Sequence, residues 1–524
     1  MTSVFIKHWL RGPYTLAHSN ATSEVVDSSV PKKWLTGDVI DPHSGNILSR
    51  ILPKDLVGIV DYLNRTGYGF TPRGIPLYMF HPLDPAYPPM LVSSKTKYNS
   101  NMIVTVNMEH WEGKWPRAGI QRILGVAGDR GIEKSALFLR AGASASACAD
   151  TATEPTADTS IHKRILWDTV FHIDPEGCED VDDVICWQIN KDSALFAIAI
   201  ADVSAWVQQD SALDIAAAKR GQTLYVDGKV HTPMLPTSIS SGCASLRSDG
   251  KERPVLALVY SFIGGVLNHV SWQPLLITVQ KTYSYESVYS EPEMCARLTL
   301  FLESLLGRTV GKDSHTWIEA AMVEYNRRAA ELLKGHSYAL LRSHAGRSHS
   351  KYVELAEKTG VAELAWLGSA AGKYVRADAE AAAHAGLGLE TYTHASSPLR
   401  RYADLVNQRA LKHILFGTAE PKAPLAETLN VRGEAAKSLE RDLWFLTNLS
   451  TTSITSVEGY VLEFKESRGS WLVYVPAWRR KVRAKVGDGL WLPSIGQTCA
   501  VRAFVDLRRC VWSERLVCAI GPVK

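Results

Sequence analysis

The chain of 524 residues lacks paired cysteines, long apolar runs and a strong net charge. Its eight cysteines are scattered without a Cys-x-x-Cys pair, which argues against a zinc ribbon or a disulfide framework and fits a reducing compartment. No apolar run approaches the roughly 18 residues of a membrane span. The net charge of +4 permits a nucleic-acid partner but does not require one. We therefore expect a soluble, intracellular protein without a membrane partner.

Two segments are depleted in particular residue types. Residues 141–160 contain no Leu, Ile, Val or aromatic residue, which is typical of a flexible linker or a surface insertion at a domain boundary. The first 23 residues contain no Asp or Glu but carry Lys7 and Arg11. Residues 1–32 therefore read either as a flexible, loosely packed terminus or as an organelle-targeting segment, and the compartment as cytoplasmic or mitochondrial.

The remaining sequence predicts three domains of an α+β protein. Residues 33–140 contain short apolar runs broken by Gly, Pro and Asn, a spacing typical of a small β-barrel. Residues 161–449 begin with strand-like runs and end with helical patterns, which indicates an α+β domain, and residues 456–524 return to short strands. We expect helices at Ala212–Arg220, Ile318–Lys334, Ser369–His384, Pro398–Leu415 and Leu425–Asn448.

Both predicted barrel regions have features of nucleic-acid-binding surfaces. Aromatic and basic residues interleave between Tyr62 and Arg73, as in barrels that stack bases on aromatic rings, although half-buried aromatics are common in any sheet. Arg479 to Lys485 alternates charged and apolar residues, so one strand face could hold several cations near backbone phosphates. An edge strand guarded by Lys and Arg explains this second pattern equally well.

Four aspartates fall within ten residues, in a segment that runs from His172 to Asp183. Hard divalent cations such as Mg²⁺ take carboxylate oxygens together with water and substrate phosphate, so the cluster is a candidate metal cradle for phosphoryl chemistry. A solvated acidic turn is the alternative, since Asp, Pro and Gly are ordinary turn residues. Apolar, strand-like runs flank the segment on both sides and favour the metal site. The four candidate ligands are Asp174, Asp180, Asp182 and Asp183.

A second segment, Thr393 to Asp404, carries the adjacent arginines Arg400 and Arg401 before a predicted helix. Free backbone N–H groups at a helix start favour an anion, and guanidinium groups bind phosphate oxygens bidentately. An acidic metal cradle with arginines at a helix start can stabilise a phosphoryl transition state. The alternative is that the arginines only pair with nearby carboxylates such as Asp404.

These segments carry a resemblance to a known family. The run Ile173 to Asp183, and the run His394 to Asp404 followed by Arg409, resemble the two signatures of the ribonuclease II/ribonuclease R (RNB) family. Segments between them fall in the family's order, and the resemblance covers roughly residues 161–449. The flanking regions resemble the family's cold-shock and OB-type barrels more faintly. The intermediate segments are Ile200 to Trp206, Arg220-Gly221, Tyr225, Met234 to Pro236, Ser245 to Arg247, Arg253-Pro254 and Tyr285-Glu286.

The resemblance implies a central RNB-type catalytic domain flanked by small OB-type β-barrels. It also implies a 3′→5′ exoribonuclease that hydrolyses single-stranded RNA to 5′-mononucleotides with Mg²⁺, acting as a monomer, with proteins of RNA-decay complexes as candidate partners. The four aspartates match the family's metal ligands, and Asp183, Arg400 and Arg401 match its catalytic residues. Four further residues match its RNA-binding positions. The resemblance implies that Tyr225 and Tyr338 stack on bases and that Tyr285 and Glu440 read the ribose 2′-OH.

A protein of another class would also fit this resemblance. A catalytically idle family member could serve as an RNA-binding or assembly module. Such a protein would be free to lose its metal ligands, whereas this sequence retains all four aspartates. The retained aspartates favour the enzyme.

Overall fold

The chain forms two compact units. A computed structural model describes residues 3–6, 14–18, 23–26, 33–35, 38–41, 44, 46–64, 66–142, 155–226, 228–345, 351–367, 371–379, 383–424, 426–466, 469–487 and 491–523. Unit 1 comprises Met1–Ser144, His349–Gly368 and Ala435–Lys524, and unit 2 comprises Ala145–Ser348 and Ser369–Glu434. The last boundary falls within the long helix α7, Ala426–Asn448.

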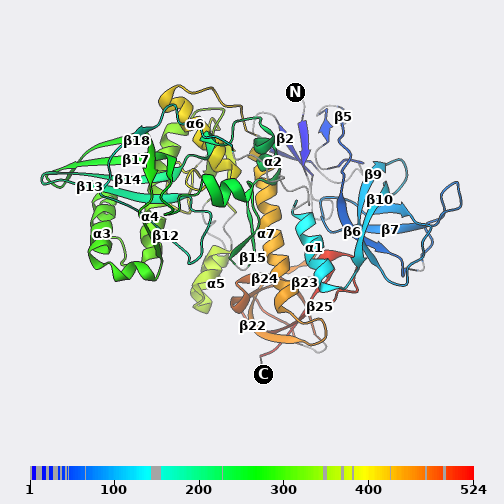
Figure 1. The fold of residues 1–524 in the computed structure, drawn as a ribbon. Coiled ribbons are helices and arrows are strands. Elements are labelled where there is room, and N and C mark those ends of the chain that lie inside the picture. Colours follow the sequence, from blue (N-terminus) through cyan, green and yellow to red (C-terminus); the bar gives the residue numbers. More distant parts are fainter. Residues whose placement is uncertain are drawn as a thin grey trace. The chain divides into compact units, whose positions relative to one another are not determined.

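Unit 2 is built on a seven-stranded sheet with the order β11-β18-β17-β14-β13-β12-β19. Figure 1 labels its strands β18, β17, β14, β13 and β12. Its inner neighbours are antiparallel, whereas the edge strands β11 and β19 pair in parallel. The strands are β11 (Lys163–Arg164), β12 (Thr169–Asp174), β13 (Asp183–Ile189), β14 (Ser193–Ala201), β17 (Glu252–Ile263), β18 (Val266–Thr278) and β19 (Lys281–Ser284). Two small hairpins add β15 (Leu224–Val226) with β16 (Lys229–Thr232), and β20 (Leu340–Ser343) with β21 (Lys373–Arg376).

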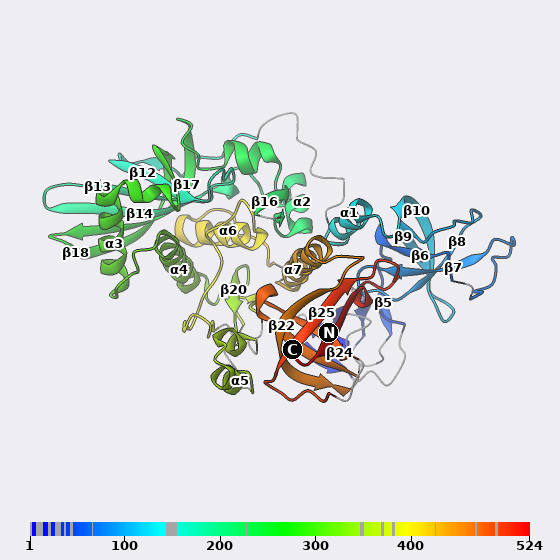
Figure 2. The same cartoon turned by 90° about the horizontal axis from the view of Figure 1, so that it is seen from below.

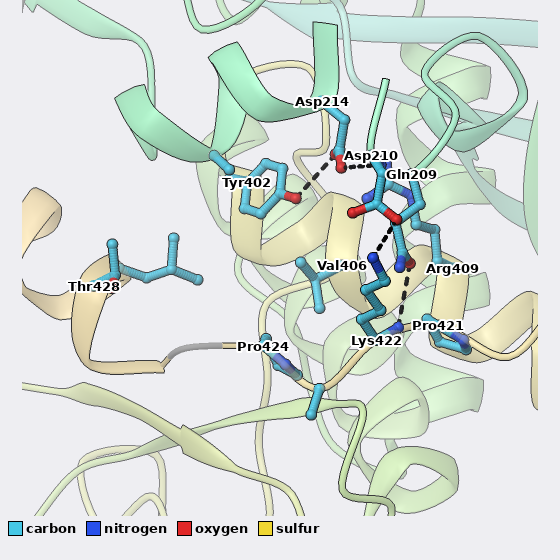
Figure 3. A pocket seen from close by; sticks show the side chains of 13 residues that line it. Gln209, Asp210, Asp214, Tyr402, Val406, Arg409, Pro421, Lys422, Pro424 and Thr428 are labelled. Carbon is cyan, nitrogen blue, oxygen red and sulfur yellow. Dashed lines mark hydrogen bonds and ion pairs between the residues drawn. The ribbon is translucent and has the colours of Figure 1, made fainter. Parts of the chain in front are cut away.

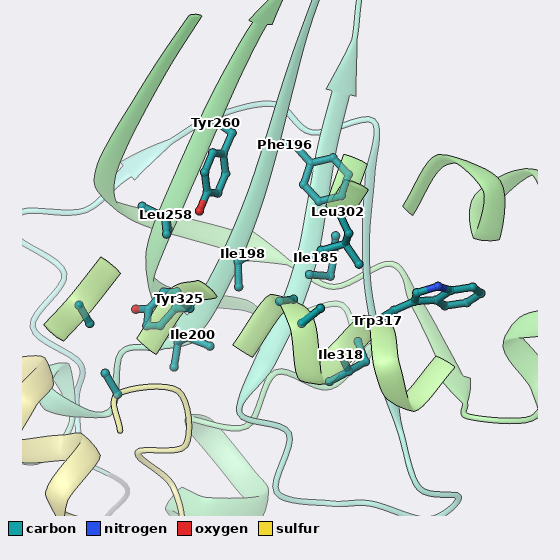
Figure 4. Close-up of a cluster of buried hydrophobic side chains, with 14 of the residues drawn as sticks. Ile185, Phe196, Ile198, Ile200, Leu258, Tyr260, Leu302, Trp317, Ile318 and Tyr325 are labelled. Atoms are coloured by element: carbon teal, nitrogen blue, oxygen red, sulfur yellow. The ribbon is translucent and has the colours of Figure 1, made fainter. Parts of the chain in front are cut away.

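The two faces of this sheet differ in side-chain size. Successive side chains of a strand point to opposite faces, so β14 sends Phe196, Ile198 and Ile200 to one face and three alanines to the other. The large side chains pack against helices in the core shown in Figure 4. The alanine face receives the loop that contains Leu399. Small side chains there let this loop approach the sheet closely.

Helices of unit 2 cover both faces of the sheet. Buried residues of α3, α4 and α6 join the core on the large-residue face, and Figure 2 shows α4 beside α6 (yellow). The alanine face packs against Ala217 of α2. The helices are α2 (Ala212–Arg220), α3 (Pro292–Leu306), α4 (Ser314–Leu333) and α6 (Tyr402–Phe416).

Polar contacts fix α6 at the end of β14. Gln408 donates from Nε2 to the carbonyl oxygen of Ala201 at 2.8 Å, and Lys412 Nζ lies 2.6 Å from the buried carboxylate of Asp202. Burial alone would raise the pKa of Asp202, but Lys412 and His162 outweigh it and hold that pKa well below its usual range. The start of α6, and the arginines just before it, are thereby fixed relative to the sheet.

Unit 1 contains a small sheet and two closed five-stranded barrels. The sheet comprises β1 (Ser3–Ile6), β2 (Tyr14–His18), β3 (Ser23–Val26), β4 (Val39–Ile40) and β5 (Ile47–Ser49). The first barrel comprises β6 (Leu56–Asp61), β7 (Leu77–Pro82), β8 (Met90–Ser93), β9 (Met102–His110) and β10 (Arg117–Val126), followed by α1 (Arg130–Arg140). The second comprises β22 (Thr455–Lys465), β23 (Ser470–Val475), β24 (Arg480–Val486), β25 (Thr498–Val505) and β26 (Leu516–Gly521), and α5 (Lys351–Thr359) packs on it through Leu355.

A buried ion pair joins α1 to the second barrel within unit 1. Arg515 Nη1 lies 2.5 Å from Glu133 Oε2, and the two side chains are 2% and 0% exposed. Glu133 also accepts from the backbone N–H of Gly128 at 2.9 Å. Arg515 donates as well to the carbonyl oxygens of Arg509 and Leu507. Almost every polar group of the pair is satisfied, as a buried pair requires.

The α+β class and the flanking barrels are confirmed, and several elements match their predicted bounds. Helix α2 covers the predicted residues because Ser211 caps its first turn and Gly221 ends it with a φ of 77°. The predicted helix over Ser369–His384 is wrong: residues 373–376 form β21, which pairs with β20. Helix α6 begins at Tyr402, after the turn of residues 398–400, and not at Pro398.

Other predictions concern residues that are described in part. Residues 143–154 of the predicted linker lie outside the described residues. Within the predicted flexible segment 1–32, the described residues form β1, β2 and β3. The predicted domain boundaries and the targeting role of the N-terminal segment stay predictions. Among the helices of the described ranges, none is both long and apolar enough to cross a membrane.

Replacing Arg515 by Met should destabilise unit 1 strongly. Loss of the guanidinium leaves the Glu133 carboxylate buried without its partner, which costs about 3–5 kcal/mol in the free energy of unfolding. Arg508→Met is the matched control, because Arg508 is 89% exposed in its ion pair with Asp506 and its loss should lower the free energy of unfolding far less than that of Arg515. Urea denaturation followed by tryptophan fluorescence measures both. Equal losses would contradict a structural role for the buried pair.

Candidate active site

The aspartate loop, residues 174–183, connects two antiparallel strands of the unit 2 sheet. Strand β12 ends at Asp174, β13 begins at Asp183, and the pairing of Phe171 with Ile185 places both ends at one side of the sheet. A turn reverses the chain, with a backbone hydrogen bond from Cys178 to Pro175 at 3.0 Å and a φ of 78° at Gly177. Pro, Glu and Gly at this point form the turn that their residue types favour.

Hydrogen bonds from a neighbouring segment hold the aspartate loop in place. The Val181 N–H donates to Ser245 Oγ at 3.0 Å, and that hydroxyl donates to the carbonyl oxygen of Glu179 at 2.7 Å. The Leu246 N–H donates to the Val181 carbonyl at 3.0 Å. Val181 itself is fully buried. The loop is therefore held by the fold at Glu179 and Val181, while residues 175–177 form its exposed turn.

Asp182 joins the aspartate loop to the arginine segment, residues 397–401. Its side chain is 3% exposed, and it accepts from the Leu399 N–H at 2.9 Å and from Arg400 Nε at 3.0 Å. Burial raises the pKa of Asp182 to about 7, although Arg400 and the Leu399 N–H act in the opposite direction. Both carboxylate oxygens of Asp182 thus face a donor from the arginine segment.

Asp183 is the aspartate without such compensation. Among the described residues, its carboxylate accepts no hydrogen bond. Burial, and after it the negative charges of Asp174 and Asp182, raise the pKa of Asp183 well above its usual range, with Arg400 opposing. A carboxylate in this environment is stabilised by a nearby cation.

The donor set fits a hard divalent cation. Four aspartates supply oxygen ligands of the kind that Mg²⁺ prefers, and their charge exceeds that of the one arginine bonded to them. Over the part of the chain that the structure describes, no three His, Cys, Asp or Glu side chains are already gathered as a metal site.

Asp180 is held by Tyr225 of β15. The Tyr225 hydroxyl donates to Asp180 Oδ2 at 2.6 Å, and Cys178 Sγ lies 3.7 Å from the other oxygen. Burial, and then the bond to Asp180, raise the pKa of Tyr225. The same hairpin is tied to the arginine segment, because the Thr223 N–H donates to the carbonyl oxygen of Arg400 at 2.9 Å. Three distant segments therefore meet here.

The two adjacent arginines have different partners. Arg400 is 44% exposed and bonds to Asp182 and, through Nη2, to Ser397 Oγ at 3.0 Å. Arg401 instead donates to the fully buried Asp404 at 2.8 Å. The alternative of simple pairing with Asp404 thus holds for Arg401. Arg400 is the arginine that lies beside the aspartates with part of its guanidinium open to solvent.

The remaining predicted site residues are less closely connected. Tyr285 stacks on His315 with ring centroids 3.8 Å apart, and burial followed by the charges of Asp174 and Asp183 raises its pKa to about 12. The Tyr338 hydroxyl lies 2.8 Å from His336 Nδ1. The Tyr338 ring lies against His336 and His413, and among the described residues it contacts none of the four aspartates. Glu440 is exposed on the part of α7 that belongs to unit 1. The roles of these residues stay predictions.

Sequence reasoning gave no role to two histidines, His172 beside the aspartate loop and His394 near the arginine segment. His172 Nδ1 lies 2.8 Å from Asp174 Oδ2, and its position two residues before Asp174 on a strand was a signal that both share one face. His394 Nδ1 is hydrogen-bonded to the Tyr374 hydroxyl, with 2.7 Å between the two atoms. Burial, and then Arg401 and Arg342, hold the pKa of His394 well below its usual range.

Two cavities of unit 2 differ in their relation to this site. One of about 590 Å³ opens beside the aspartate loop and is lined by His172, Asp174, Cys178 and Thr282, among others. The other, of about 220 Å³, lies between α2 and α6 (Figure 3). There the buried Asp214 already binds the Tyr402 hydroxyl at 2.9 Å and Arg409 at 2.8 Å. The first cavity reaches the aspartate loop, and Asp174 is the member of the four aspartates in its lining.

Two family models match parts of the chain. The RNB domain matches residues 164–293 and 304–417, and the Dis3-like cold-shock domain 2 matches residues 77–142. Ribonuclease R of Helicobacter pylori is 28% identical over 382 residues, which is 57% of this chain and 58% of that protein. The chain thus spans about half the length of the curated relatives it matches.

Solved structures similar in fold include three that come from two proteins. Mycoplasma genitalium RNase R in its apo form has a TM-score of 0.70 at 17% identity, covering 99% of this chain and 100% of that one. The same protein was solved with ribose methylated single-stranded RNA, with a TM-score of 0.69. Yeast Ssd1, a pseudonuclease, also has a TM-score of 0.70, at 15% identity and with 96% of this chain and 81% of that chain covered.

Proposed function

Because the chain belongs to the RNB domain family, we propose that it is a 3′→5′ exoribonuclease that hydrolyses single-stranded RNA to 5′-mononucleotides. The observation that carries the proposal is the junction of the aspartate loop with the arginine segment, in which the buried Asp182 accepts from the Leu399 N–H with one oxygen and from Arg400 Nε with the other. It sets carboxylates for a cation and a partly open guanidinium for a phosphate side by side. Single-stranded RNA as substrate is supported by the complex of the Mycoplasma protein.

We propose Asp174, Asp180, Asp182 and Asp183 as the residues that hold Mg²⁺. When bound, a divalent cation lowers the pKa of a water molecule and neutralises charge that develops on the phosphate. Asp182 orients the guanidinium of Arg400, whose remaining N–H groups can donate to phosphate oxygens. Arg401 and its partner Asp404 fix the start of α6 behind it. Arg400 is thus the arginine that would contact the scissile phosphate.

Aromatic side chains would hold the RNA. Tyr225 is anchored to Asp180 through its hydroxyl, which leaves its ring to stack on a base near the 3′ end. We propose Tyr338 as a second stacking residue, and Tyr285 with Glu440 as readers of the ribose 2′-OH, the group that separates RNA from DNA. The protein would act as a monomer within the cell, with proteins of RNA-decay complexes as candidate partners.

A catalytically idle RNA-binding or assembly module is the second candidate. The likeness of the fold to the pseudonuclease Ssd1, at a TM-score of 0.70, favours it. The retention of four aspartates beside Arg400, with Asp183 half-buried and accepting no hydrogen bond among the described residues, favours the enzyme. An activity assay separates the two.

The enzyme should shorten single-stranded RNA in Mg²⁺ and leave it intact in EDTA. A 5′-labelled strand resolved on a denaturing gel shows shortening from the 3′ end. Asp183→Asn should abolish hydrolysis and keep RNA binding, because phosphate and stacking contacts remain. Asp192→Asn, in the exposed β13–β14 turn, is the matched control with wild-type activity. RNA that stays intact with wild-type protein in Mg²⁺ would identify the idle module.

Arg400→Lys should lose most of the activity, and Arg401→Lys should lose stability before activity. A lysine offers a point charge where the site has a planar fork bonded to Asp182 and Ser397. Arg401 instead neutralises the buried Asp404. Turnover numbers and thermal unfolding of both variants distinguish the two roles. If Arg401→Lys is the inactive, stable variant, Arg401 contacts the phosphate.

Tyr225→Ala should release longer end products at nearly unchanged rates on long RNA. Stacking is worth roughly 1–3 kcal/mol per base, and only a product of a few nucleotides depends on one base contact. Tyr225→Phe keeps the ring and removes only the bond to Asp180, so it should keep both the wild-type limit product and a nearly unchanged rate on long RNA. The end products of a 5′-labelled strand measure this. Identical limit products for Ala and wild type would make Tyr225 a packing residue.

A further inference from the structure

A chain of hydrogen bonds leads from the surface of unit 2 to Asp174. Ser248 Oγ lies 2.7 Å from Thr282 Oγ1, which lies 2.9 Å from His172 Nε2. His172 Nδ1 lies 2.8 Å from Asp174 Oδ2. Four side chains from three segments therefore form one continuous series. None of them was among the residues expected to act on RNA except Asp174.

The strand register builds this series. Strands β12 and β19 are parallel neighbours in which His172 is paired with Thr282 and Asp174 with Ser284. Side chains at paired positions point to the same face, which brings the imidazole and the threonine hydroxyl together. His172 is 4% exposed, whereas Asp174 is 19% exposed at the strand end. The buried imidazole is thus fixed by the sheet, and the carboxylate stands at its solvent side.

The donors along the series can be assigned from the chemistry of the groups. An ionised carboxylate only accepts, so the Nδ1–H of His172 donates to Asp174. In that neutral tautomer Nε2 accepts, and the Thr282 hydroxyl is the donor that it meets. The Thr282 oxygen can in turn accept from the Ser248 hydroxyl. Every ring nitrogen of His172 has a partner, so the orientation of the ring is determined.

We infer that His172 is a positioning residue that orients the carboxylate of Asp174 toward the cation, with Thr282 holding the imidazole. The bond engages Oδ2, and in the described residues Oδ1 accepts no hydrogen bond, so Oδ1 is left for the ion. Hydrogen-bonded partners of metal ligands fix ligand orientation, and losing one typically costs about 10- to 100-fold in metal affinity. The inference rests on the proposed function only in taking Asp174 as a ligand.

Cation affinity of the RNA-free protein tests this inference without an activity assay. Mn²⁺ is the probe, since carboxylate sites that suit Mg²⁺ also take Mn²⁺, and electron paramagnetic resonance counts the free ion. His172→Leu removes the donor and should weaken Mn²⁺ binding by about 10- to 100-fold. His172→Asn places an amide N–H where Nδ1 stood and should restore most of the affinity. His269→Leu, at an exposed position of β18, is the matched control with wild-type affinity.

A buried histidine with a purely structural role would give another pattern. Leu and Asn variants would then lower thermal stability together and leave Mn²⁺ affinity unchanged, which would overturn the inference. Thr282→Val removes the donor to Nε2 and keeps the side-chain shape. It should weaken Mn²⁺ binding by a smaller factor than His172→Leu, and it serves if His172→Leu does not fold. Wild-type affinity in Thr282→Val together with loss in His172→Asn would also contradict the inference.

The outcome is separable from that of the proposed function. Wild-type protein that binds Mn²⁺ through His172-oriented Asp174 but leaves RNA intact would refute the exoribonuclease and support the inference. Protein that degrades RNA with equal Mn²⁺ affinity in wild type and His172→Leu would support the enzyme and refute the inference. Absence of any Mn²⁺ site that Asp183→Asn removes would overturn the inference as well.

Discussion

The arrangement of the site depends on one buried carboxylate. Asp182 receives a backbone N–H and a guanidinium N–H from a segment 217 and 218 residues further along the chain. Removing one partner of a buried charge typically costs about 3–5 kcal/mol, so neither the aspartate loop nor the arginine segment can shift alone without a large penalty. The junction fixes the aspartate loop and the arginine segment to each other at the ends of β12 and β13. Positive and negative groups are held near each other without neutralising all of the negative charge.

The four clustered aspartates show how environment differentiates one residue type. Asp174 is held by an imidazole, Asp180 by a phenol and Asp182 by a guanidinium, while the described residues give Asp183 no hydrogen bond. The first three carboxylates are oriented by their partners. The pKa of Asp183 is raised by burial and by the negative charges of Asp174 and Asp182. Three oriented carboxylates beside one that accepts no hydrogen bond are an arrangement whose energy a nearby cation would lower.

Much of this was accessible from the sequence, but the partners of each side chain were not. The aspartates and Arg400 were identifiable because they stand in short, specific patterns. The different partners of Arg400 and Arg401 were not, because they depend on the position of Asp404 in the first turn of α6. The Ala-rich segment 369–384 was predicted as a helix from propensity. Pairing of β21 with β20 overrides that preference, because tertiary contacts outweigh fractions of a kcal/mol per residue. The links of Tyr338 and Glu440 to RNA remain predictions.

The discontinuous make-up of unit 1 has a consequence for how the chain reaches its folded state. Its segments lie on both sides of unit 2 in the sequence, and the ion pair of Glu133 with Arg515 spans 382 residues. Contacts of such sequence separation form late, because the loop between them must close first. During synthesis from the N-terminus, the sheet of unit 2 can be complete before Arg515, the ion-pair partner of Glu133 in α1, has been synthesised. The order of assembly on the ribosome is therefore expected to place the aspartate and arginine segments together before the second barrel exists.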